Sequence, residues 1–151
     1  WHPEVEKSEL EEEMKKKTHV RTRVRRSKNG DNTKTRDRLS DATKVPANAE
    51  WLVISGQVGF DAKGKIAGTV RQQTEQAFRN ILICLKENGM TKKHLVKFTV
   101  FLTDPRSIDA YRAARKKMIG DGTLPASTLL IVDGLASPDM LVEIEATAAK
   151  A

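Results

Sequence analysis

The sequence contains one cysteine, Cys84, in 151 residues, and it has no long uninterrupted apolar stretch. A single cysteine cannot form an internal disulfide and is too few for a thiolate metal site, so both kinds of stabilisation are excluded. No stretch approaches the roughly 20 apolar residues that a membrane-spanning helix needs, so we expect no membrane partner. The first residues are rich in Glu and Lys, unlike a secretory signal, and we expect a cytoplasmic location.

Histidines are also few. His2, His19 and His94 lie far apart, without a cysteine or carboxylate cluster at metal-ligand spacing. The segment GKIAG lacks the Lys-Ser/Thr ending of a phosphate-binding loop. We therefore expect no metal and no cofactor. Cys84 occurs at helical spacing from apolar neighbours, which indicates a buried structural thiol rather than a nucleophile.

The net charge of +7 is concentrated near the start of the chain. Residues 1–45 hold 13 Lys or Arg against 9 Asp or Glu, which accounts for four of the seven excess positive charges. Aromatic residues are absent from 2–50, so the basic segment has no stacking platform for single-stranded nucleic acid. We expect 1–36 to be a charged, solvated N-terminal extension and 37–151 to form one domain. Nucleic-acid contact through the basic segment is the weaker alternative, since charge alone is weak evidence.

Hydrophobic periodicity predicts alternating strands and helices across the domain. Gly56 and Gly59 are expected to close the first strand, and a further strand is expected before Trp51. Thr69 is a suitable N-cap for the first helix, and Gly89 is its expected stop. The predicted strands cover 51–60, 94–104, 127–132 and 139–149, and the predicted helices cover 69–89 and 105–120. This order predicts an α+β sandwich with two helices on one face of a sheet.

The last predicted strand alternates apolar and polar side chains. Its expected core face comprises Met140, Val142, Ile144 and Ala146, and its other face comprises Glu143, Glu145 and Thr147. Two helices can cover only one face of the sheet, yet the opposite face also carries Phe101. A partly apolar, uncovered face predicts association with another subunit.

Six fragments in register resemble the YjgF/RidA family, also called the Rid or endoribonuclease L-PSP family. They are VISGQVG, QTEQAFRNI, LVKFTVFLTD, the aromatic residue of IDAYRAA, LPAST and VEIEATA, and together they span about 51–149. The resemblance implies a chorismate-mutase-like fold with a mixed sheet. It also implies a homotrimer with clefts for a small-molecule ligand between neighbouring subunits.

The resemblance also implies which residues form the site. Deaminating members hydrolyse 2-imino or enamino acids and carry an arginine directly after Pro-Ala, whose planar fork suits the substrate carboxylate. Here Ser127 follows Pro-Ala, so the chain resembles a branch without that arginine, and standard 2-imino acid deamination is not expected. Glu143 matches the water-positioning carboxylate and is the predicted catalytic residue. Ser55, Gly56 and Ser127 are the predicted substrate-binding residues.

Several alternatives remain open. The chain either hydrolyses a small imine, enamine or related carbonyl-type metabolite, or only binds a metabolite or partner, and RNA binding of the endoribonuclease type is a third hypothesis. Glu143 and its neighbours on the same face are otherwise surface or interface side chains. An arginine on a predicted helix could replace the missing one, and the sequence does not choose among Arg71, Arg79, Arg106, Arg112 and Arg115.

Overall fold

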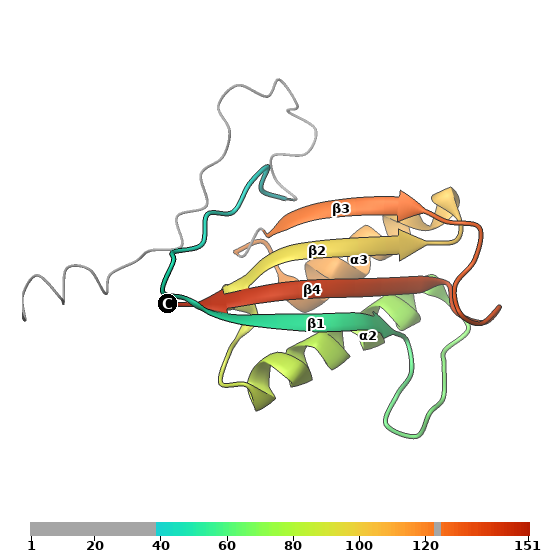
Figure 1. Cartoon of the computed structure of the whole chain (residues 1–151). Coiled ribbons are helices and arrows are strands. Elements are labelled where there is room, and N and C mark those ends of the chain that lie inside the picture. The colour runs from blue at the N-terminus through green and yellow to red at the C-terminus, as the bar shows by residue number, and fades with distance from the viewer. Residues whose placement is uncertain (1–38, 123–124) are drawn as a thin grey trace, which may run out of the picture.

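A computed structural model describes residues 39–122 and 125–151, and Figure 1 shows how its strands and helices are layered. Four strands form one mixed sheet in the order β1-β4-β2-β3. β4 pairs antiparallel with both β1 and β2, whereas β2 and β3 run parallel. The strands are β1 (Glu50–Val58), β2 (Leu95–Leu102), β3 (Ala126–Ile131) and β4 (Val142–Lys150).

Two helices, α2 (Val70–Glu87) and α3 (Ile108–Ile119), lie behind the sheet in Figure 1 and cover one of its faces. Short 3-10 turns, η1 (Lys92–His94) and η2 (Pro105–Ser107), precede β2 and α3. The predicted α+β sandwich with two helices on one face of a mixed sheet is confirmed. Neither helix of the described ranges has the length and apolar content needed to cross a membrane.

The helix ends follow the predicted local signals. The Thr69 hydroxyl accepts a hydrogen bond from the Gln72 backbone N–H at 3.3 Å, which caps α2. Gly89 follows the helix with φ of 66°, a conformation that favours glycine. Before α3, the Asp104 side chain accepts a hydrogen bond from the Arg106 N–H at 2.8 Å. Predicted and observed helix boundaries therefore agree closely.

The core lies between the two helices and the face of the sheet that they cover. Buried β2 and β4 side chains alternate with more exposed ones, as predicted, and Val142, Ile144 and Ala146 all face inward. Phe78 of α2 meets Phe98 of β2 edge-to-face, with ring centroids 5.4 Å apart. Cys84 is only half-buried and packs against the edge of this core.

The predicted strand bounds agree in part with the structure. Residues 39–49 form no continuous strand: Ser40 makes a single bridge to Ala126, and a turn follows at Pro46. The strand expected before Trp51 is therefore not found in this part of the chain, and the residues before 39 lie outside the described ranges. β1 runs through Gly56 and ends at Val58, directly before Gly59, the second glycine expected to close it. β4 begins at Val142 rather than in the 139–141 segment, whose backbone turns back and bonds outside the sheet. The predicted extension, 1–36, and its boundary with the domain lie outside the described residues.

The opposite face of the sheet has no helix over it among the described residues, and this face is turned toward the viewer in Figure 1. Trp51 and Val53 of β1 lie on this side and are 54% and 78% exposed. Leu130 of β3 lies beside Phe101 of β2 and is also exposed. We call the apolar group Trp51, Val53, Phe101 and Leu130 the open face.

Candidate functional site

A β-bulge interrupts the pairing of β1 with β4. Ile54 pairs with Ala146, but the next pair is Gln57 with Ile144, so β1 contains one extra residue at Ser55-Gly56. A bulge bends its strand and redirects nearby groups. Ser55 is exposed at this bend, and its carbonyl accepts a hydrogen bond from the Gln57 side chain at 3.1 Å.

The bulge brings Gly56 against the carboxylate of Glu143. An added Cβ at Gly56 would lie 2.0 Å from Glu143 Oε1 and 2.8 Å from its carboxyl carbon. Only glycine therefore allows the carboxylate to rest against this backbone. Glu143 is half-buried, and no hydrogen bond or ion pair joins its carboxylate to the rest of the described residues. The carboxylate is placed to accept a hydrogen bond from a water or a ligand.

Ser127 lies on the other face of the sheet. It pairs in parallel with Phe98, whose ring is buried beneath the helices, whereas Glu143 pairs with Phe101 of the open face. Residues directly opposite in neighbouring strands share a face, and residues three apart in one strand do not. The structure thus brings Gly56 and Glu143 together with Ser55 beside them, but it does not bring Ser127 to them within one chain.

The surroundings of Ser127 are aromatic and cationic. Tyr111 of α3 is buried, and its hydroxyl has no hydrogen-bond partner of standard geometry among the described residues. Burial raises the pKa of Tyr111 to about 12, while the nearby Arg115 guanidinium and the Ser127 hydroxyl oppose this rise. Ser127 therefore lies close to the phenol without completing a hydrogen bond to it.

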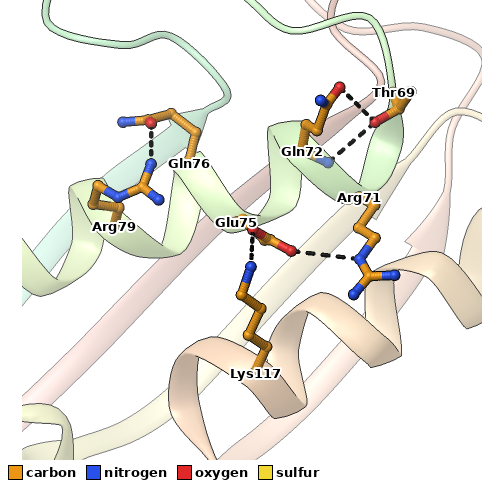
Figure 2. A network of polar contacts seen from close by, with 7 residues as sticks. All are labelled: Thr69, Arg71, Gln72, Glu75, Gln76, Arg79 and Lys117. Carbon is orange, nitrogen blue, oxygen red and sulfur yellow. Dashed lines mark hydrogen bonds and ion pairs between the residues drawn. The ribbon is translucent and has the colours of Figure 1, made fainter.

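A second carboxylate, Glu75, is fully engaged in holding the helices together. Its side chain is 15% exposed, and it accepts hydrogen bonds from Lys117 of α3 at 2.7 Å and from Arg71 at 3.4 Å (Figure 2). The hydrogen bond from Lys117 is the largest cause of the lowered pKa of Glu75, and Arg71 adds to it. This carboxylate therefore links the two helices, whereas the Glu143 carboxylate makes no such contact within the described residues.

Gln73 is a positioning residue that the sequence analysis did not identify. It is buried on α2 and donates to the carbonyls of Ala67 at 2.7 Å and Asp139 at 2.8 Å. Its Oε1 accepts from the Leu141 N–H at 2.9 Å, which fixes the chain directly before β4 and hence before Glu143. The available signal was a glutamine within the apolar stripe of the helix. Gly59 permits the close approach, because a Cβ there would lie 2.6 Å from Gln73 Cβ.

The residues considered for metal binding form no cluster within the described part of the chain. His94 accepts a hydrogen bond from the Thr91 N–H at 2.9 Å and so caps η1. Among residues 39–122 and 125–151, no three His, Cys, Asp or Glu side chains lie close enough together to hold a metal ion. His2 and His19 lie outside this part of the chain.

A family model and solved structures connect this chain to the same group of known proteins. The family model described as Endoribonuclease L-PSP matches residues 31–150. A conserved Rid family protein of Yersinia pestis, YyfB, has a similar structure, with 26% identity, a TM-score of 0.76 and coverage of 85% of this chain and 98% of that chain. RidA from the Antarctic bacterium Psychrobacter sp. PAMC 21119 is 30% identical, with a TM-score of 0.62 and coverage of 72% and 85%.

A curated relative extends the comparison to a eukaryote. Protein mmf2, mitochondrial, of Schizosaccharomyces pombe is 32% identical over 101 residues, which cover 66% of this chain and 79% of that protein. Its compartment differs from the cytoplasm predicted above, so the cytoplasmic location of this chain stays a prediction. The fold, the matched model and these relatives agree, and the chain belongs to the YjgF/RidA, or endoribonuclease L-PSP, family.

Proposed function

We propose that the chain forms a homotrimer and binds or hydrolyses a small imine, enamine or related carbonyl-type metabolite in clefts between subunits. Glu143 is the catalytic residue of this proposal, and Ser55, Gly56 and Ser127 bind the substrate. The observation that carries it is the contact between Gly56 and Glu143, which holds a carboxylate without a cationic partner in the described residues against a bulged backbone.

Association supplies what one chain lacks. Ser127 and Glu143 lie on opposite faces of the sheet, so a cleft lined by both requires residues from two copies. The open face offers exposed apolar side chains for such contact, and burial of apolar surface is the main driving force of association.

The chemistry follows from the groups present. The Glu143 carboxylate would position or deprotonate a water that attacks the carbon of the imine, and backbone groups of the Ser55-Gly56 bulge would border the reacting atoms. Ser127 can hydrogen-bond a substrate carboxylate but cannot neutralise it. We therefore assign the chain to a branch without the usual arginine, in which standard 2-imino acid deamination would need a cation from elsewhere in the chain.

Ammonia release tests this proposal. The full chain is mixed with freshly generated 2-aminoacrylate or iminopropionate, and Glu143→Gln is compared with Glu145→Gln, which changes an exposed carboxylate on the same strand and face. We expect loss of release for Glu143→Gln alone, by about 100-fold or more. Release no faster than in buffer for the unaltered chain would leave a binding protein, and equal rates for both variants would remove Glu143 from the mechanism.

A further inference from the structure

The chain that leaves β1 beside Glu143 alternates between the two faces of the sheet. Val58 is the register partner of Glu143, so its side chain lies on the same face as the carboxylate. Gly59 points the other way, because a Cβ there would lie 2.6 Å from the Gln73 Cβ on α2. Phe60 therefore returns to the face of Glu143. Its side chain is 36% exposed, so the ring is available for contact with a ligand.

Phe60 has an apolar neighbour on the same face. It forms an antiparallel bridge with Ile66, and residues directly opposite one another share a face. Val58 precedes Phe60 by two residues and also lies on this face. We call Val58, Phe60 and Ile66 the apolar strip. The strip begins directly beside Glu143, whose carboxylate rests against Gly56.

Hydrogen bonds hold the backbone of the apolar strip in place. The Asn80 side chain of α2 donates to the carbonyls of Val58 at 3.2 Å and Phe60 at 3.1 Å. The turn that follows Phe60 is closed by Asp61, whose carboxylate accepts hydrogen bonds from two backbone N–H groups at 2.8 and 2.9 Å. A surface that is fixed before binding loses less conformational entropy when a ligand arrives.

A carboxylate that adjoins an apolar surface suits a ligand with two different parts. Small-molecule sites combine apolar walls with a few polar groups that fix the orientation of the ligand. Glu143 would contact the polar part, and the apolar strip would contact a hydrocarbon substituent. Phe60 lies two residues beyond Val58, which is about 7 Å along the chain, so a methyl substituent at Glu143 would not reach the ring.

We propose that Phe60, together with Val58 and Ile66, sets the specificity of the site for a substrate with an apolar substituent larger than methyl. An imino acid with a branched hydrocarbon side chain is such a substrate. The reacting group rests on the function proposed above, whereas the apolar preference rests on the placement of the strip.

Two matched substrates test the inference. Iminopropionate and 4-methyl-2-iminopentanoate, both freshly generated, share the imine and the carboxylate and differ only in a methyl against an isobutyl substituent. We expect the full chain to release ammonia from the isobutyl compound with a kcat/KM about 10- to 50-fold higher, since each buried methylene contributes roughly 4-fold. Phe60→Ala should reduce this ratio to about 3-fold or less, and Phe60→Leu should keep part of it.

Ile83→Ala is the matched control, because it also shortens an exposed apolar side chain, on the helical side of the molecule. It should keep the substrate ratio of the unaltered chain. A ratio near one for the unaltered chain, or a ratio that Phe60→Ala leaves unchanged, would overturn the inference. Loss of the assembly in Phe60→Ala, measured by light scattering, would also overturn it, because the ring would then belong to a subunit contact.

Calorimetry separates this inference from the proposed function. 4-Methyl-2-oxopentanoate and pyruvate differ in the same substituent, and their binding needs no turnover. Binding of 4-methyl-2-oxopentanoate that is tighter by about 10-fold or more and depends on Phe60, together with no ammonia release, would support the apolar strip and refute the catalysis. Ammonia release with a substrate ratio that does not depend on Phe60 would refute the role of the strip and leave the catalysis in place.

Discussion

The Glu143 carboxylate rests on the backbone of Gly56, where the place of a missing side chain is occupied by a carboxylate oxygen. Because the obstructing atom is the end of a flexible side chain, Gly56→Ala should cost about 1 kcal/mol or less in folding free energy. It should nevertheless abolish ammonia release, since the Glu143 carboxylate must move away from its position against residue 56. Urea unfolding and ammonia release measure the two effects. Gly134→Ala, at a site with open space, is the control and should change neither.

Gln73 and Leu141 form the link that sets the start of β4. Gln73→Leu removes three hydrogen bonds to backbone groups and leaves those groups without their partner, so it should lower the free energy of unfolding by about 2 to 4 kcal/mol. Chemical denaturation checks the value. Gln76→Leu changes a less buried glutamine on the same helix and should cost under about 1 kcal/mol, and equal losses for both would show that Gln73 has no special role.

The ion pairs of Glu75 predict that the free energy of unfolding falls at acidic pH. The pKa of Glu75 is lowered in the folded state from its ordinary value of 4.5, chiefly by Lys117. Its contribution to stability is therefore complete above pH about 4.5 and is lost as the pH falls through the lower folded-state pKa. Urea unfolding between pH 6 and about pH 3 should show a smaller loss for Glu75→Gln than for the unaltered chain. Parallel curves would contradict the prediction.

Tyr111→Phe should leave the free energy of unfolding unchanged or increase it by about 1 kcal/mol, because the variant removes a buried hydroxyl that has no partner in the described residues. It should also change the behaviour at high pH. Burial raises the pKa of the Tyr111 phenol to about 12 from an ordinary value of 10.0, so the unaltered chain loses stability as the pH rises from 10 through 12. Thermal unfolding at pH 9 and pH 11 should show a smaller loss of stability between the two pH values for Tyr111→Phe than for the unaltered chain.

Val53 provides a test of the proposed trimer. It is 78% exposed on the open face, and a charge buried there at a subunit contact would be unfavourable by about 2 kcal/mol or more. Val53→Glu should therefore shift the assembly toward single chains in light scattering. Ile83→Glu alters a half-exposed residue on the helical side and should leave the assembly unchanged. A single-chain mass for the unaltered protein at micromolar concentration would refute the trimer.

Local signals were sufficient for most of the fold. Thr69, Gly89 and the alternation of β2 and β4 depend on neighbouring residues, so their outcome could be read from the sequence. The bulge at Gly56 could not, because it depends on the register of β1 against a strand about 90 residues later in the chain. For Gln73 the sequence offered only a glutamine within the apolar stripe of α2, because its three hydrogen-bond partners come from two loops distant in the chain.

The site was predictable only in part for the same reason. Resemblance placed Glu143 and Gly56 in one site, and the structure shows them in contact. Resemblance placed Ser127 there as well, but the pleat puts its side chain on the opposite side of the sheet from Glu143.

The bridge between Ser40 and Ala126 affects how copies of the chain can meet. β3 is an outer strand, and an outer strand with free N–H and C=O groups can recruit a strand from another molecule and start unlimited stacking. Ser40 forms a bridge with Ala126, and its N–H donates to the Pro125 carbonyl at 3.3 Å, so the pairing position at the start of β3 is already occupied. A strand from another molecule that paired along the whole of β3 would therefore have to displace this segment.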